Sequence, residues 1–216
     1  MTLKLAERLA TSQTWLDGVS DRLQPMVRKT VAKVGRRGAD ALDGVWIGTP
    51  LHPVLTDLPV GGLTTAVTLD VIGSATGSRT IDRQADGALA VAVASSVVAA
   101  VTGISDWRYL RGENRRLAAG HGLLNVLGLV CNATSVGLRF SGRRRAGRVA
   151  SGLGTAIAGA AAHLGGELSF EKGVRVDAAR SEAGPTQFEP VLAESQLDGT
   201  AMHRVNVDGA AVLVTR

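Results

Sequence analysis

The sequence predicts an all-α membrane protein: a bundle of four transmembrane helices, with an amphipathic helical segment before it and a short β-like tail after it. Three observations lead to this prediction. The middle of the chain holds four apolar stretches of similar length, aromatic residues are scarce, and basic residues gather where the apolar stretches end. Most of the charge lies in the first and last 50 residues or so and in the short segments between the stretches.

Each apolar stretch has about the length that a helix needs to cross the hydrocarbon core of a bilayer, roughly 20 residues. The four stretches are Leu58–Ser78, Gly87–Ser105, Leu117–Leu138 and Val149–Gly166. If all four cross, successive helices run in opposite directions. Asp70 is the one charged residue inside these stretches. We interpret it as a neutral, hydrogen-bonded side chain that faces Ser95, Ser96 or Asn132.

The composition favours lipid over water as the surroundings of these helices. Phe, Trp and Tyr make up only 3% of the chain, whereas a soluble core of this size usually relies on large aromatic side chains. Membrane helices pack well without them, because small residues let backbones approach closely. In the last stretch, Gly154, Ala158 and Ala162 recur at four-residue spacing, which predicts close packing within the chain or in a homo-oligomer.

The net charge of +5 raises the question of whether the protein binds nucleic acid. The basic residues do not form one stripe, however, and they flank the apolar stretches. Flanking charge of this kind orients membrane helices and meets anionic headgroups. We therefore expect the lipid bilayer as a partner and no nucleic acid. Nine Lys and Arg residues lie near the helix ends on the side of both termini and seven on the other, a small excess that predicts cytoplasmic termini.

Residues 1–48 predict an amphipathic helical segment. Apolar residues recur at helical spacing from Leu16 to Val34, with Arg and Lys between them, a pattern typical of helices at membrane surfaces or packed on a bundle. Pro25 falls inside this pattern, so we expect two short helices rather than one. Pro53 and Pro59 likewise predict a kinked entry into the first transmembrane helix.

Three of the four histidines fall at one end of the predicted bundle: His52, His121 and His163. Imidazoles on facing helices are the ligands that a bundle needs for haem iron or another transition metal. Polar residues that could orient these imidazoles lie nearby on the same side, namely Asp57, Asn125 and Glu167. Two interpretations stay open: the three histidines bind haem b, or they only tie helices together by hydrogen bonds. We find no catalytic motif.

Four motifs occur in an order that resembles a known family: GTPLHPVLTDLPVG, GISDWRYLRGENRR, AGHGLLN and HLGGELSFEKGVRV. The chain resembles, over about residues 40–177, a family of predicted four-helix membrane proteins of unknown function. In bacteria that domain is often followed by a Rieske iron–sulfur domain. The resemblance implies a multi-pass protein of the bacterial inner membrane and a Rieske-type protein as partner, with the three histidines at motif positions.

The end of the chain also resembles the opening strands of a Rieske domain. Val205 and Val207 alternate with polar residues, Asp208–Gly209 predicts a tight turn, and Ala211–Val214 follows as a second strand. A Rieske cluster needs two Cys and two His, and the one cysteine, Cys131, lies in the third apolar stretch. We expect no 2Fe–2S cluster in this chain and a truncated Rieske-like segment. The predicted parts are 1–48 (amphipathic), 49–176 (membrane domain), 177–190 (linker) and 191–216 (β segment).

Overall fold

The computed structural model describes residues 12–176, 189–197, 199, 201–207 and 210–215. The chain divides into two units, Met1–Leu168 and Ser169–Arg216, and each is considered by itself. The expected linker over residues 177–190 lies almost wholly outside the described residues.

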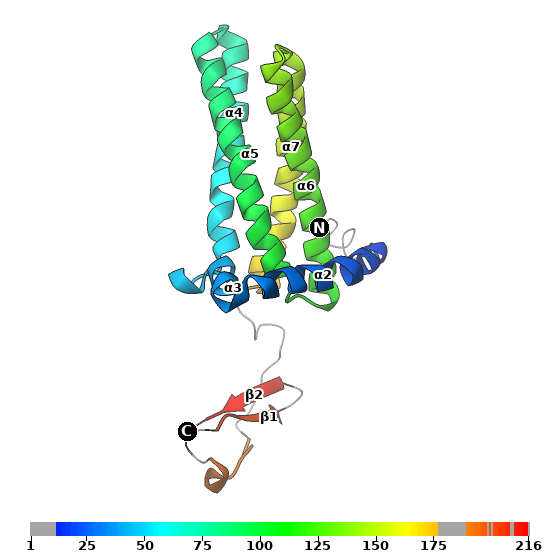
Figure 1. The fold of residues 1–216 in the computed structure, drawn as a ribbon, viewed down its shortest axis with the longest axis vertical. Helices are drawn as coiled ribbons and strands as arrows, with labels where there is room; N and C mark the ends of the chain where they lie inside the picture. Colours follow the sequence, from blue (N-terminus) through cyan, green and yellow to red (C-terminus); the bar gives the residue numbers. More distant parts are fainter. Residues whose placement is uncertain (1–11, 177–188, 198, 200, 208–209, 216) are drawn as a thin grey trace. The chain divides into compact units, whose positions relative to one another are not determined.

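Four long helices form the body of the first unit: α4 (Leu51–Thr76), α5 (Arg79–Trp107), α6 (Gly112–Phe140) and α7 (Arg144–Gly166). They lie side by side, and short connections join α4 to α5 and α6 to α7 (Figure 1). Because α4 packs mainly on α5, and α6 mainly on α7, we call α4–α5 the first hairpin and α6–α7 the second hairpin. The chain turns in each hairpin at a glycine with positive φ, Gly77 or Gly142.

Three of these helices, α4, α5 and α6, are long and apolar enough to cross a membrane. The predicted helical fold with membrane-spanning segments is therefore confirmed at the level of three candidate spans. The described part of α7 is shorter, and its first turns contain Arg144, Arg145 and Arg148. A fourth crossing by α7 stays a prediction.

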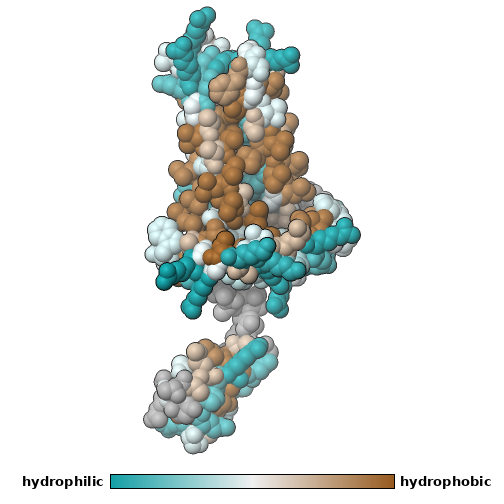
Figure 2. Space-filling model, in the orientation of Figure 1, coloured by the Kyte–Doolittle hydropathy of each residue, from teal (hydrophilic) through white to brown (hydrophobic). Residues whose placement is uncertain are grey.

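The distribution of side chains is that of a protein whose solvent is lipid. The core holds small residues, including Ala66, Ala85 and Ala92, all fully buried. Leu89 and Leu117 are also buried, but many large aliphatic side chains lie exposed on the outside of the bundle, Val71, Val91 and Val130 among them. Figure 2 shows this apolar surface along the long helices, with hydrophilic residues at both ends. Bulky residues on the surface and small ones inside are what close helix packing in a bilayer requires.

Two shorter helices precede the bundle, α2 (Trp15–Lys33) and α3 (Gly35–Asp43), and they lie across one end of it (Figure 1). The expected break at Pro25 is wrong, because α2 continues through this exposed proline. The helix ends at Lys33 instead, and the next residue but one, Gly35, has a φ of 70°. This left-handed conformation, which suits glycine, sets the new direction of α3.

A break in the helix at Pro53 or Pro59 does not occur, because α4 runs unbroken from Leu51 to Thr76; a kink there stays a prediction. Pro53 lies in the first turn, where a backbone N–H has no acceptor within the helix and its loss costs nothing. Pro59 is buried inside the helix. Neighbouring helices stabilise such a proline in membrane proteins, so one missing backbone hydrogen bond does not end the helix.

The second unit contains a two-stranded antiparallel sheet of β1 (His203–Val207) and β2 (Ala210–Val214). Val207 pairs with Ala210 and His203 with Val214, so the predicted β-hairpin is confirmed. The expected Asp-Gly turn, residues 208–209, lies outside the described residues.

Candidate functional site

Polar side chains gather inside the bundle at its two ends. At the end near α2 and α3 we define the histidine pair as His52 and His121. At the other end we define the ion-pair cluster as a group of six side chains from all four long helices: Asp70, Asp82, Asp86, Arg139, Arg144 and Arg148.

Each histidine of the pair is hydrogen-bonded to the neighbouring helix of its own hairpin. His52 Nδ1 lies 2.9 Å from the Ala99 carbonyl oxygen, and His121 Nδ1 lies 2.7 Å from that of Ala161. A carbonyl only accepts, so both Nδ1 atoms carry the hydrogen and donate it. Each Nε2 of a neutral ring then has a lone pair. The ring centroids lie 6.3 Å apart with the rings nearly perpendicular.

Glycines make room for both imidazole rings. A Cβ atom at Gly103 would lie 2.8 Å from His52 Cε1, and one at Gly165 would lie 2.9 Å from His121 Cε1. Both distances are shorter than van der Waals contact. The backbones of α5 and α7 therefore serve as walls of the histidine pair.

The other residues predicted for this site lie differently. Asn125 Nδ2 is 3.1 Å from His121 Nε2, in position to donate to it. Glu167 Oε1 lies 3.4 Å from His163 Nε2, and Asp57 is exposed. Within the described residues, no group of three or more His, Cys, Asp and Glu side chains is arranged to hold a metal ion. The structure thus brings His52 and His121 together but does not join His163 to them in a metal site.

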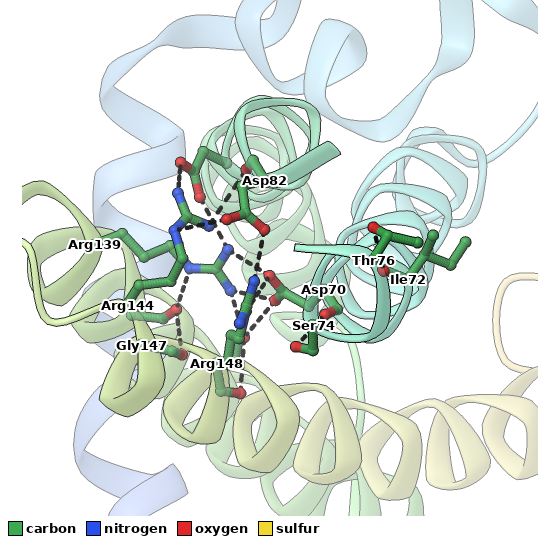
Figure 3. Close-up of polar contacts among 12 residues, drawn as sticks. Asp70, Ile72, Ser74, Thr76, Asp82, Arg139, Arg144, Gly147 and Arg148 are labelled. Carbon is green, nitrogen blue, oxygen red and sulfur yellow. Dashed lines mark hydrogen bonds and ion pairs between the residues drawn. The ribbon is translucent and has the colours of Figure 1, made fainter. Parts of the chain in front are cut away.

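The ion-pair cluster joins three aspartates of the first hairpin to three arginines of the second; Figure 3 shows Asp70 and Asp82 among the three arginines. Arg139 binds the Asp70 carboxylate through both terminal nitrogens, with Nη1 at 2.9 Å from Oδ1, and its Nη1 lies 3.0 Å from Asp86 Oδ1. Arg148 Nη2 lies 2.6 Å from Asp82 Oδ1, and Arg144 pairs with both Asp82 and Asp86. Three negative and three positive charges balance.

The most buried members of this cluster are Arg139 and Asp70, whose side chains are 3% and 7% exposed. Hydroxyl groups complete their hydrogen bonds: Ser135 accepts from Arg139 Nε at 3.0 Å, and Ser151 from Nη2 at 2.9 Å. A buried charge is tolerated when it is paired and hydrogen-bonded in this way. The interpretation of Asp70 as a neutral residue facing Ser95, Ser96 or Asn132 is therefore wrong, because its partners are arginines.

Sequence reasoning missed this cluster because the arginines were assigned to lipid headgroups. A signal was nevertheless present. Asp82 and Asp86 lie four residues apart at the start of α5, and Arg144 and Arg148 lie four apart at the start of α7. Each pair occupies one face of its helix.

The two hairpins are built on one plan with opposite charges. Asp70 follows His52 by 18 residues, and Arg139 follows His121 by 18. The carbonyl acceptors Ala99 and Ala161 each come 17 residues after the first ion-pair cluster residue of their helix, Asp82 or Arg144. The ion pairs follow the same correspondence, in which Asp70 matches Arg139 and Asp86 matches Arg148. The pair Asp86–Arg139 therefore has Asp70–Arg148 as its counterpart. This is a pseudo-twofold arrangement of the kind found among parallel repeats in membrane proteins.

Ion pairs also attach the N-terminal helices, one to each hairpin. Asp43 at the end of α3 accepts from Arg108 Nη2 at 2.7 Å and from the Tyr109 hydroxyl at 3.0 Å. Burial works to raise the pKa of Asp43, but the hydrogen bonds and the charge of Arg108 outweigh it and lower that pKa. Asp17 of α2 pairs with Arg116 of α6, whose hydrogen bond lowers the pKa of this carboxyl.

Comparison with known proteins gives a family. Residues 48–178 match the family described as predicted membrane protein (DUF2231). The search of curated proteins and the search of solved structures each found no match. The family match covers more than half of the chain and includes both hairpins, with the histidine pair and the ion-pair cluster. The chain therefore belongs to this family of predicted membrane proteins.

Proposed function

We propose that this protein is a membrane-embedded anchor, in which the histidine pair and the ion-pair cluster fasten the helices at the two ends of the bundle. The observation that carries the proposal is the bonding of His52 and His121. Each donates Nδ1–H to a main-chain carbonyl of the adjacent helix and packs on a glycine of that helix. Hydrogen bonds between helices are worth on the order of 1 kcal/mol in membrane proteins.

The test compares His52→Ala and His121→Ala with His163→Ala in purified protein. The first two changes remove a bond between helices, whereas His163 pairs with Glu167, one turn further along its own chain. We expect a lower midpoint of thermal unfolding in detergent for His52→Ala and His121→Ala, a smaller change for His163→Ala, and no change in bound metal. Equal effects of all three changes would contradict the proposal.

A second candidate function, binding of haem b by His52 and His121, is favoured by one distance. His52 and His121 would hold the haem, since their ring centroids lie only 6.3 Å apart and imidazoles on facing helices are typical haem ligands. The carbonyl bonds at both Nδ1 atoms also fix the rings and leave Nε2 as the ligating atom, the usual arrangement around metal-bound histidine. Asn125 would have to release His121 Nε2.

Visible spectroscopy decides between the two functions. If haem b binds to the pair, protein supplied with haemin shows a Soret band that His52→Ala and His121→Ala abolish and His163→Ala retains. A colourless wild-type protein that takes up no haemin would eliminate the haem function and leave the anchor function intact.

The anchor would hold a redox partner at the membrane. We propose a Rieske-type iron–sulfur protein for this role, supported by the β-hairpin of the second unit and by the resemblance of its sequence to the start of a Rieske domain. We further propose a bacterial inner membrane location, a fourth crossing by α7, cytoplasmic termini and a homo-oligomeric assembly. Cysteine labelling from each side of the membrane at Arg22 and at Arg143, changed to Cys in a Cys131→Ser background, tests the orientation.

A further inference from the structure

We propose that the protein binds the phosphate group of an anionic amphiphile in a cavity between α2, α3 and the α5–α6 connection. The cavity has a volume of about 400 Å³. Four arginines contribute to its wall, together with Tyr109 and aliphatic residues of α2 and α3. The arginines are Arg28, Arg36, Arg108 and Arg111.

The described residues neutralise the positive charge of this cavity only in part. Arg108 is buried and fully engaged with Asp43, and the exposed Arg36 lies 3.8 Å from Asp40. Arg28 and Arg111 form no ion pair with any of the described residues. The guanidinium of Arg111 and the N–H groups of Arg28 that do not donate to Arg108 or Gln24 are thus available to an anion. A guanidinium group presents several N–H donors in one plane. It can therefore bind two oxygens of a phosphate group at once.

Hydrogen bonds hold this cavity in shape. Gln24 of α2 donates through Nε2 to the carbonyl oxygens of Trp107 and Leu110, both at 2.9 Å. Arg28 donates through Nε to the carbonyl of Arg108 at 3.0 Å. Because α2 is tied to the connection at three carbonyls, Arg28 and Arg111 are kept on the same cavity before any ligand arrives, which lowers the entropy lost on binding.

The position and the lining of the cavity indicate an amphiphile. The connection between Trp107 and Gly112 joins two candidate membrane spans, so crossing of the bilayer by both spans would place the cavity where headgroups meet the hydrocarbon. Its aliphatic lining, including Val31 and Ala39, suits the glyceryl part of a phospholipid next to the phosphate. Basic sites at this depth bind anionic lipid headgroups. A soluble phosphate ester would share the phosphate chemistry but make no use of the aliphatic wall.

Binding of phosphatidylglycerol to the purified full chain in detergent, followed by native mass spectrometry, tests this proposal. We expect phosphatidylglycerol to bind more tightly than phosphatidylcholine. Because a charge-assisted hydrogen bond of 1.4 kcal/mol corresponds to a factor of ten, Arg111→Gln and Arg28→Gln are each expected to raise the Kd about tenfold. Arg22→Gln is the matched control, since Arg22 is exposed on the same helix and does not line the cavity.

The Arg111 side chain forms no hydrogen bond or ion pair with the described residues, so Arg111→Gln keeps the test valid even if Arg28→Gln loosens α2. Inorganic phosphate that displaces phosphatidylglycerol would assign the cavity to soluble phosphate compounds, whereas no displacement would assign it to the lipid. Unchanged binding by the Arg28→Gln/Arg111→Gln protein would overturn the proposal. An equal loss with Arg22→Gln would do the same, because it would show diffuse attraction rather than a site.

Discussion

The two hairpins share one framework and differ in the sign of their charges. In the first hairpin the three charges of the ion-pair cluster are all aspartates, and in the second all are arginines. Both hairpins carry a histidine at the other end, bonded to a carbonyl across the hairpin. A hairpin of either kind cannot pair with its own copy through these charges, since like charges would face each other. The difference therefore specifies that the first hairpin pairs with the second.

The largest effect is expected from removing the central arginine. Arg139→Ala leaves the buried Asp70 carboxylate without its bidentate partner. Breaking a buried ion pair from one side costs about 3–5 kcal/mol, and we expect a loss of this size in the free energy of unfolding in detergent. Arg143→Ala, an exposed residue at the same end of the bundle, is the control, with an expected change within about 0.5 kcal/mol.

Charge reversal sharpens the comparison further. Exchanging only Asp70 and Arg139 places an aspartate beside Asp86 and an arginine beside Arg148, so we expect incomplete recovery relative to Arg139→Ala. Reversing all six charges restores every opposite-charge contact, and we expect unfolding close to that of the wild type. The free energy of unfolding in detergent, measured as for Arg139→Ala, tests both expectations. Full recovery by the single exchange would show that the six charges do not act as one cluster.

The next largest effect is expected from replacing the glycines that face the histidine pair. Gly103→Ala in the first hairpin and Gly165→Ala in the second each place a methyl group within 3 Å of an imidazole ring. Overpacking of this kind costs about 1–3 kcal/mol, and the matched plan predicts similar losses in both hairpins. Gly159→Ala, where the added Cβ meets no atom within 4 Å, is the control. A large loss in one hairpin only would break the correspondence.

A smaller effect is expected from the ion pair that attaches α3, and it is larger than the effect of the ion pair that attaches α2. The pKa of Asp43 is lowered in the folded protein, so its contribution to stability is present above the ordinary pKa of aspartate, about 4, and is lost as the pH falls through the lowered value. We expect tryptophan fluorescence to report loosening of α3 in this acid range. Asp43→Asn should already be loosened at neutral pH and change little on acidification.

The smallest effect is expected at Asp17, whose partner Arg116 is a quarter exposed. Exposed ion pairs contribute little and are screened by salt. We expect Asp17→Asn to increase proteolysis of α2 slightly at low salt and not at high salt. If salt has no influence on this difference, the attachment of α2 depends on its buried face, including Leu16 and Ser20, rather than on the ion pair.

Much of the fold was predictable because hydrophobic length and periodicity act locally. The apolar stretches gave the positions of the long helices to within several residues, and the Val205/Val207 alternation gave the β-hairpin. The prolines misled the prediction for a physical reason. A proline removes only one backbone hydrogen bond, and the packing of neighbouring helices around Pro59 compensates for it.

The candidate site was predictable only in part. Helix direction placed His52 and His121 at one end of the bundle, but the carbonyls of Ala99 and Ala161 that hold them carry no side-chain signal. The partners of Asp70 were missed since they lie 69 and 78 residues away in the sequence.

The sequence by itself determined that the chain is helical, where its apolar segments lie and which end of the bundle receives the histidines, because all three depend on spacing along the chain. Only the tertiary structure decided which charges meet. Whether an arginine such as Arg139 faces a lipid headgroup or a buried carboxylate depends on how the second hairpin packs against the first, and that packing joins residues far apart in the sequence, such as Leu63, Leu89 and Val136.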